Sequence, residues 1–150
     1  MKIVVNRSLN SSVSVNNEIV GKINKGLVLL VGFTYNDNID DIDYLVNKVI
    51  NLRIFEDSEG KMNKSLLDVN GEILSISQFT LYSDTRKGNR PSFKDALGYE
   101  EALKLYEIFN EKLKEKNIKV ETGIFGEDML VNINNDGPVT IILESGDKNA

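Results

Sequence analysis

Apolar and polar residues alternate in short runs along much of the chain, which is the pattern of half-buried strands. Strands are expected over 2–7, 12–15, 18–23, 72–82, 118–121, 128–134 and 139–144. A turn at 16–18, "NNE", joins the second of these strands to the third. The run 26–33 is apolar without alternation, which indicates a central strand buried on both faces.

Two segments repeat their apolar residues at helical spacing instead. The first follows a cap at Asp37 or Asn38, and its apolar positions are Ile42, Leu45, Val46, Val49 and Ile50. The second covers about 99–116, and its stripe consists of Tyr99, Ala102, Leu103, Tyr106, Phe109 and Leu113. Strand groups with two helices set between them predict an α+β fold with mostly antiparallel strands. We expect one domain over 1–150, with a frayed tail at 146–150.

Composition removes several kinds of chemistry. The chain has neither cysteine nor histidine, which excludes disulfides, thiol nucleophiles, Ser-His-Asp triads and histidine metal sites. No metal and no cofactor are expected. The net charge of −5 argues against non-specific nucleic-acid binding, although a local basic patch could still dock one RNA. No apolar run is long enough to span a membrane and no signal peptide is apparent, so the cytoplasm is the expected location.

Three segments could carry function. The first is "SQFT", Ser77 to Thr80, whose hydroxyls, amide and backbone N–H groups are the parts of an oxyanion site. Spacing alone favours an ordinary strand with polar outward positions. The second is "TRKGNR", in which Arg86, Lys87 and Arg90 form either a phosphate-binding loop or a solvated charged loop.

The third segment is "NDGPVT", 135–140. The proline removes a backbone donor and most simply marks the turn or end of a strand. Glycine has no Cβ, so another molecule can approach its backbone closely. If the bond before Pro138 is cis, two neighbouring carbonyls could point together and bind an ammonium group. The sequence leaves the isomer open.

Taken together, "SQFTLYSDTRKGNRPSF" and "TGIFGEDMLVNINNDGPVTIILES" closely resemble the D-aminoacyl-tRNA deacylases, also called D-tyrosyl-tRNA deacylases. The opening "MKIVVNRSLNSSVSVNNEIVGKINKGLVLLVGF" fits too, so the resemblance covers essentially the whole chain. One departure is Asn6, where the family usually has Gln before the arginine. The resemblance implies β-β-α layers, with the sheets forming a sandwich or pseudo-barrel beside two main helices.

The resemblance also implies an esterase that releases D-amino acids, and mischarged glycine, from tRNA. Its members are homodimers with active sites at the interface, where the Gly-cisPro of one subunit reaches into the other's pocket. Carried over, Ser77, Gln78, Phe79 and Thr80 are the catalytic set. Gly137 and Pro138 present backbone oxygens to the substrate ammonium, and Arg7 helps to hold their loop in its orientation. Phe125 and Met129 match further positions of the pocket. Arg86, Lys87 and Arg90 are the candidates for binding tRNA.

Two mechanisms fit these residues. Thr80 could act as a nucleophile, or the 2′-hydroxyl of the terminal adenosine could assist attack by water. The second is favoured because the sequence supplies no base beside Thr80. An L-substrate would drive its side chain into the Gly-Pro backbone, and a methyl group at Gly137 should block the pocket with little unfolding. Two rival hypotheses are a tRNA-binding protein without catalysis and a structural dimer.

Overall fold

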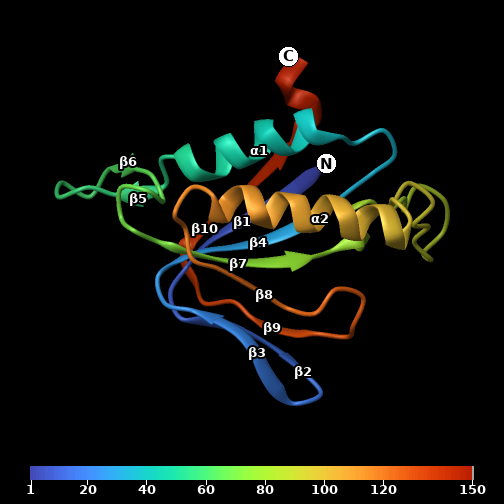
Figure 1. The fold of residues 1–150 in the computed structure, drawn as a ribbon, viewed down its shortest axis with the longest axis horizontal. Coiled ribbons are helices and arrows are strands. Elements are labelled where there is room, and N and C mark those ends of the chain that lie inside the picture. The colour runs from blue at the N-terminus through green and yellow to red at the C-terminus, as the bar shows by residue number, and fades with distance from the viewer. Residues whose placement is uncertain (150) are drawn as a thin grey trace.

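The computed structural model describes residues 1–149, which form two α-helices, two short 3-10 helices and ten strands (Figure 1). The helices are α1 (Ile39–Asn51), α2 (Tyr99–Lys114), η1 (Phe79–Leu81) and η2 (Ser145–Asn149). The strands are β1 (Lys2–Ser8), β2 (Ser11–Val15), β3 (Glu18–Ile23), β4 (Gly26–Gly32), β5 (Phe55–Glu56), β6 (Met62–Lys64), β7 (Glu72–Ser77), β8 (Val120–Thr122), β9 (Leu130–Asn132) and β10 (Asn135–Glu144).

The elements stack in three layers, which confirms the α+β fold and its β-β-α order. The middle layer is a five-stranded sheet in the order β10-β1-β4-β7-β8. The two α-helices cover one face of this sheet, and the three-stranded sheet β3-β2-β9 lies against the other (Figure 1). Strand β4 shows why the order holds, because Leu27 and Leu29 contribute to the core under the helices while Val28 packs in the core between the sheets.

The large sheet is mixed rather than wholly antiparallel. Strand β1 pairs antiparallel with β10 and β4, whereas β4, β7 and β8 run parallel to one another. Parallel neighbours need a long crossover, and α1 lies within the connection from β4 to β7. The two sheets do not close into a barrel and instead pack face to face as a layered sandwich, as expected.

Helix α1 begins where the sequence predicted. Asn38 is the N-cap: its side chain accepts from the Asp40 N–H, while the Asp41 carboxylate accepts from the Asn38 N–H at 2.9 Å. All five predicted apolar positions of this helix are buried. They form the contact between α1 and the large sheet.

Two segments differ from their predicted structure. Strand β7 ends at Ser77 rather than continuing to 82. Its pairing with β8 stops at Ser75 and its pairing with β4 stops at Ser77. The last hydrogen bond to β4 runs from the Gln78 N–H to the Val31 carbonyl. The chain then turns into η1. The polar stretch after α1 contains the small hairpin β5–β6, whose exposed second strand gave no alternating signal.

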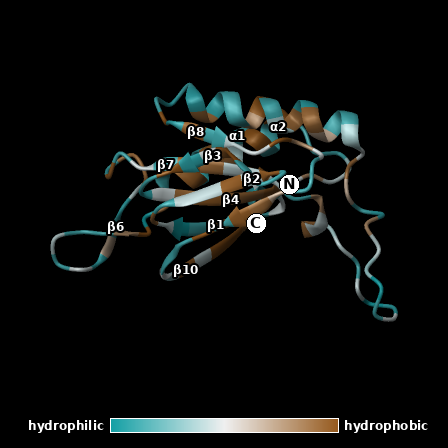
Figure 2. Cartoon of the chain, turned by 90° about the horizontal axis from the view of Figure 1, so that it is seen from below, coloured by the Kyte–Doolittle hydropathy of each residue, from teal (hydrophilic) through white to brown (hydrophobic). Residues whose placement is uncertain are grey.

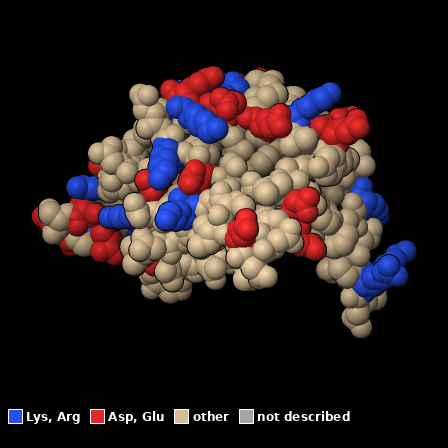
Figure 3. Space-filling view, turned by 60° about the horizontal axis from the view of Figure 1, so that its bottom comes forward, with Lys and Arg blue, Asp and Glu red and all other residues tan. Residues whose placement is uncertain are grey.

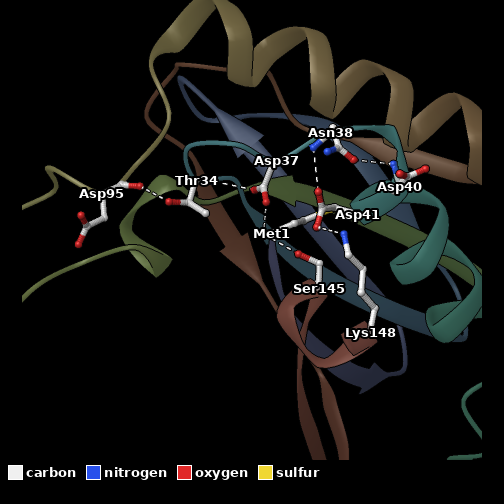
Figure 4. Close-up of polar contacts among 9 residues, drawn as sticks. All are labelled: Met1, Thr34, Asp37, Asn38, Asp40, Asp41, Asp95, Ser145 and Lys148. Atoms are coloured by element: carbon white, nitrogen blue, oxygen red, sulfur yellow. Dashed lines mark hydrogen bonds and ion pairs between the residues drawn. The ribbon is translucent and has the colours of Figure 1, made fainter. Parts of the chain in front are cut away.

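The end of the chain is also more ordered than expected. Residues Ser145–Asn149 form η2, and Ser145 is buried. Figure 4 shows the contacts that hold it: the Met1 amino group donates to Ser145 Oγ at 3.0 Å and to Asp37 at 2.7 Å, and Lys148 pairs with Asp41 at 2.7 Å. The last predicted tail position, 150, lies outside the described residues.

Candidate functional site

A pocket of about 560 Å³ lies where the parallel strands β4 and β7 end and where the chain continues beyond β8. Its wall includes Gly32 and Ser77 from the ends of β4 and β7, and residues 125–129 after β8. Ligands in open α/β sheets bind at the carboxyl ends of parallel strands, because the strands stop there and the loops diverge. This pocket has that position in the fold.

Most of the predicted catalytic segment lies at this pocket. Ser77, Gln78 and Phe79 line it, and Phe79 is largely exposed. Thr80 is not part of the lining, but its hydroxyl accepts a hydrogen bond from the Gln78 side-chain amide. An amide is no base at neutral pH, so the group that contacts the Thr80 hydroxyl cannot remove its proton.

The start of η1 supplies free backbone donors. Among residues 1–149, the N–H groups of Phe79 and Thr80 make no hydrogen bond, whereas those of Leu81 and Tyr82 close the helix onto Gln78 and Phe79. The first N–H groups of any helix lack a partner within it. Two unpaired donors beside Ser77 form the kind of group that stabilises a developing oxyanion.

Aromatic side chains form much of the remaining wall. Phe125 contacts the ring of Tyr99 at 5.1 Å between centroids and that of Tyr106 at 5.6 Å. The Tyr106 hydroxyl donates to the Ser75 carbonyl at 2.7 Å, and burial raises the pKa of this phenol. These contacts tie the predicted pocket residue Phe125 to both α2 and β7. Met129, also predicted, lies on the same stretch of wall.

Sequence reasoning missed two of the aromatic residues. Tyr99 was expected in the buried stripe of α2, but its side chain is 59% exposed and lines the pocket. Phe93 lines the pocket too, with its ring 5.2 Å from that of Phe79 and nearly perpendicular to it. Phe93 ends the "SQFTLYSDTRKGNRPSF" segment, so that stretch contained a signal for it.

The Gly137–Pro138 segment is part of β10 rather than a turn before it. Residues 136–139 lie opposite the single residue Arg7, because β1 pairs Asn6 with Thr140 and Ser8 with Asn135. The segment therefore forms a bulge at the edge of the large sheet. Both Gly137 and Pro138 are exposed, and the bond between them is cis.

Arg7 lies behind this bulge. Its side chain is buried, with Nε donating to the Asp136 carbonyl at 3.0 Å and Nη1 donating to the Ile54 carbonyl at 2.9 Å. The carboxylates of Asp136 and Glu56 lie 3.6 and 4.0 Å away and balance its charge. The predicted partnership of Arg7 with the Gly-Pro segment thus has a direct physical contact.

A second network closes the two ends of the bulge. The Asn135 side chain accepts from the Val139 N–H at 2.9 Å, and it donates to the Thr140 hydroxyl at 2.8 Å and to the side-chain oxygen Oδ1 of Asn6 at 3.2 Å. Thr140 also donates to Asn6, at 3.0 Å. Asn6, the departure from the family pattern, therefore participates in the support of this segment.

The single chain does not bring the two groups of predicted residues together. Arg7 pairs with Leu27 near the start of β4, whereas the pocket begins at Val31, near its end. Four residues of a strand extend about 13 Å. Arg7, Gly137 and Pro138 are therefore at one end of the large sheet and the pocket is at the other.

The third predicted segment projects from the body of the protein, on the side opposite the β5–β6 hairpin (Figure 2). Asp84 and Ser92 exchange two backbone hydrogen bonds at its base, and basic side chains extend from its tip at the lower right of Figure 3. Arg86 Nε and Nη2 donate to the Asp84 carboxylate at 2.9 and 2.8 Å. Hydrogen bonds from the Arg86 side chain and main chain hold the pKa of Asp84 well below its usual range.

Within the described part of the chain, no three residues among Asp, Glu, His and Cys are grouped so that they could hold a metal ion. Over the same residues, no helix is long and apolar enough to cross a membrane.

These features agree with what the chain is similar to. The family model described as D-Tyr-tRNA(Tyr) deacylase matches residues 4–144, so the chain belongs to that family, as the sequence motifs indicated. A protein named D-aminoacyl-tRNA deacylase from Clostridium botulinum (strain Alaska E43 / Type E3) is 61% identical over 145 residues, which is 97% of each chain. Another so named, from Thermosipho melanesiensis, is 58% identical over 146 residues and 97% of each chain.

Solved structures agree in fold. The c-Myc DNA Unwinding Element Binding Protein superposes with a TM-score of 0.90 at 42% identity, covering 96% of this chain and 98% of its own. A probable eukaryotic D-amino acid tRNA deacylase superposes with a TM-score of 0.79 at 17% identity, covering 95% of this chain and 98% of its own. The second likeness concerns the fold alone.

Proposed function

We propose that the protein hydrolyses the ester bond of D-aminoacyl-tRNA, releasing the D-amino acid and intact tRNA. Membership of the deacylase family and the names of its relatives support this activity. The single observation that carries it is the pair of unpaired N–H groups at Phe79 and Thr80, which follow directly on the pocket-lining residues Ser77 and Gln78. They are suited to stabilise the oxyanion formed when the ester carbonyl is attacked.

Water is the nucleophile in this proposal. It adds to the ester carbonyl carbon, and the oxyanion forms. The bond between this carbon and the ribose oxygen then breaks, and the ribose oxygen stays on the tRNA and takes up the proton that the water gives up. The adjacent 2′-hydroxyl of the substrate orients the water and relays the proton, because the Thr80 hydroxyl contacts only an amide. An aminoacyl ester is already activated, so positioning and charge stabilisation suffice. Metal and cofactor have no step in this scheme.

Chiral selection would need a second copy of the chain. In our proposal, the exposed Gly137–Pro138 segment of one subunit enters the pocket of the other and presents main-chain carbonyls to the α-ammonium group. The distance between Arg7 and the pocket within one chain supports this arrangement. So does the position of β10, which is an edge strand with an exposed Ile142. A homodimer would then have two shared sites.

In this arrangement selection is by exclusion. The ammonium and ester groups fix the substrate, so an L-side chain would collide with the Gly-Pro backbone while a D-side chain points outward. Glycine has no side chain, so glycyl-tRNA should also be hydrolysed. The role of the enzyme would be chirality proofreading in translation, and its tRNA substrate implies the cytoplasm.

The test compares release of D-Tyr and L-Tyr from tRNA by the purified protein with EDTA present. We expect rapid release of the D-amino acid only, unaffected by the chelator. Equal release of both, or none, would reject the proposal. Binding of tRNA without any turnover would support the rival interpretation of a non-catalytic RNA-binding protein, which the basic loop at 86–90 favours.

A further inference from the structure

The three cations of the basic loop, residues 84–92, are not equivalent. Arg86 is held by Asp84 through two side-chain hydrogen bonds and its own backbone N–H, and Lys94 adds a second cation to the same carboxylate at 3.6 Å. Among residues 1–149, Lys87 and Arg90 have neither an ion pair nor a side-chain hydrogen bond, and both are exposed. The charge of Arg86 is already balanced by Asp84, so Arg86 would gain less from a phosphate than Lys87 or Arg90, although its Nη1 donors are unpaired among residues 1–149.

The loop is anchored beside the pocket. Asp84 and Ser92 pair through their main chains at its base, and the next residue, Phe93, lines the pocket against Phe79. From this base the chain reaches its tip at Gly88, around which a side chain would find open space. Four extended residues span about 13 Å, or roughly four stacked nucleotides of one strand. The free cations therefore lie within reach of the phosphates next to a nucleotide bound in the pocket.

The charge on the pocket wall also favours an RNA strand beside the basic loop. Glu127 and Asp128 line the pocket and form no ion pair within the described residues. Their carboxylates repel phosphate, while Lys87 and Arg90 attract it. An RNA strand leaving the pocket is thus favoured on the side of the basic loop.

We infer that Lys87 and Arg90 bind phosphates of the single-stranded 3′ end of tRNA, next to the terminal aminoacyl-adenosine, and that Asp84 retains Arg86 as a structural residue of the loop. This inference rests on the proposed function for the identity of the RNA. It assigns to the loop the positioning of the strand and no part in the chemistry.

The test uses two substrates and a charge-matched control. D-aminoacyl-tRNA carries the 3′ phosphates, and D-aminoacyl-adenosine lacks them. The double variant Lys87→Ala/Arg90→Ala should lower kcat/KM on the tRNA several-fold and leave the adenosine substrate unchanged. Lys61→Ala/Lys116→Ala removes two exposed, unpaired cations elsewhere and should match the wild type on both substrates.

Salt dependence tests the number of contacts. Each phosphate contact to a single strand contributes a slope of about 0.7 in log Kd against log salt concentration, so the double variant should be shallower by about 1.4. The advantage of the wild type should then shrink about tenfold between about 50 and about 250 mM salt. Arg86→Ala should change this slope by much less than about 0.7. Asp84→Asn removes the partner of Arg86, so the slope of that variant should be steeper than that of the wild type.

Binding of uncharged tRNA gives a readout that needs no hydrolysis. If the wild type hydrolyses no D-ester but the slopes differ as stated, the proposed function fails and the loop assignment stands. If Lys87→Ala/Arg90→Ala binds tRNA like the control double variant, the inference is overturned. Equal losses on tRNA and on adenosine would also overturn it, because the loop would then be supporting the pocket.

Discussion

Arg7 Nε donates to the backbone carbonyl of Asp136 at 3.0 Å, across residues that are 129 positions apart in the chain. The same guanidinium donates from Nη1 to the Ile54 carbonyl at 2.9 Å. One buried side chain thus ties the bulge of β10 to the segment that follows α1. A planar fork with donors in fixed directions suits this double contact better than a flexible ammonium group.

Lysine at position 7 should therefore impair the enzyme while retaining the charge. Loss of one hydrogen bond to a charged group costs about 1.5–3 kcal/mol, equivalent to about 10- to 100-fold in kcat/KM if the Gly-Pro segment moves. We expect Arg7→Lys to lower hydrolysis of D-Tyr-tRNA by that factor and to narrow its ratio to L-Tyr-tRNA.

Arg53→Lys is the matched control for this change. Arg53 also donates through Nε and Nη2, to the Asn63 carbonyl at 3.1 Å and to its side chain at 2.7 Å, but on the exposed β5–β6 hairpin. The Arg53→Lys variant should hydrolyse D-Tyr-tRNA and L-Tyr-tRNA at the same rates as the wild type. Unaltered kinetics of Arg7→Lys beside a lowered melting temperature would assign Arg7 to stability alone.

Alanine at Gly137 should damage the fold of the segment as well as the site. A Cβ there would lie 2.9 Å from Arg7 Nη2 and 2.9 Å from Val139 Cγ2, and the backbone φ is +127°. An L-residue is strained by about 1–3 kcal/mol in such a conformation, which essentially only glycine adopts. The sequence alone suggested a methyl group that blocks the pocket with little unfolding, and the structure changes that expectation.

The measurement is the melting temperature together with D-Tyr-tRNA hydrolysis. Gly137→Ala should lose activity and melt several degrees lower. Gly146→Ala is the control, because a Cβ at that position meets nothing within 4 Å. An active Gly137→Ala variant would argue that this main chain does not enter the pocket.

Local pattern was enough to predict much of the fold. The turn after β2 appears where "NNE" indicated, with Asn16 and Asn17 both at positive φ, the conformation that asparagine tolerates best after glycine. The cap and buried face of α1 also follow from residues near one another in the sequence. Such signals are local, so the sequence contains them without knowledge of the tertiary structure.

The remaining errors arise from tertiary pairing. Alternation continues past Ser77, but a strand needs a partner, and β4 extends only one residue beyond Val31, the partner of Ser77. The pocket brings together Phe93 from a loop, Tyr99 from a helix and Phe125 from another loop, and no spacing predicts that meeting. Likewise Arg7 and "NDGPVT" were connected only by the family resemblance, because the pairing of β1 with β10 joins the two ends of the chain.

Stability should fall in acid partly through Asp41. Burial raises the pKa of this carboxyl, but hydrogen bonds from Lys148 and from the Asn38 backbone outweigh it and lower the folded-state value below the ordinary 3.8. A depressed pKa contributes stability above the unfolded value, and that stability is lost as pH falls below about 3.8 towards the folded value. Figure 4 shows the contacts concerned.

Asp41→Asn tests this contribution. The variant should be less stable at pH 7 and should lose less stability than the wild type as pH falls below 3.8. Asp40→Asn, at the exposed neighbouring position, is the control and should change neither property much. Parallel curves of unfolding free energy against pH for Asp41→Asn and the wild type would contradict the prediction.

Dimerisation through β10 should depend on Ile142, whose side chain is 62% exposed on this edge strand. Ile142→Asp should yield monomers in light-scattering measurements and abolish hydrolysis, because each pocket would lack its Gly-Pro segment. Ile19→Asp, at a position 64% exposed on the smaller sheet, should remain dimeric and active. If Ile19→Asp were monomeric and Ile142→Asp were still dimeric, the interface would not lie on β10.

Shared sites also predict complementation. Gly137→Ala retains the pocket, and Ala102→Trp fills the pocket but retains the Gly-Pro segment. Each should be inactive alone. Mixed by unfolding and refolding together, they should regain activity in about one quarter of the sites, because half of the random dimers are mixed and each has one complete site. A mixture as inactive as its components would mean that each subunit builds its site alone.

The role of Thr80 can be separated from that of the substrate by removing one hydroxyl at a time. The Thr80 hydroxyl accepts from Gln78 and has no base beside it, so Thr80→Val should slow hydrolysis of D-Tyr-tRNA by less than about tenfold. Loss of a true nucleophile costs about a millionfold. By contrast, D-Tyr-tRNA whose terminal ribose lacks the 2′-hydroxyl should react about 100- to 10,000-fold more slowly, the usual contribution of a positioned proton-transfer group. The opposite pattern, with an inert Thr80→Val variant and a normal deoxy substrate, would make Thr80 the nucleophile and the free N–H groups of η1 its oxyanion site.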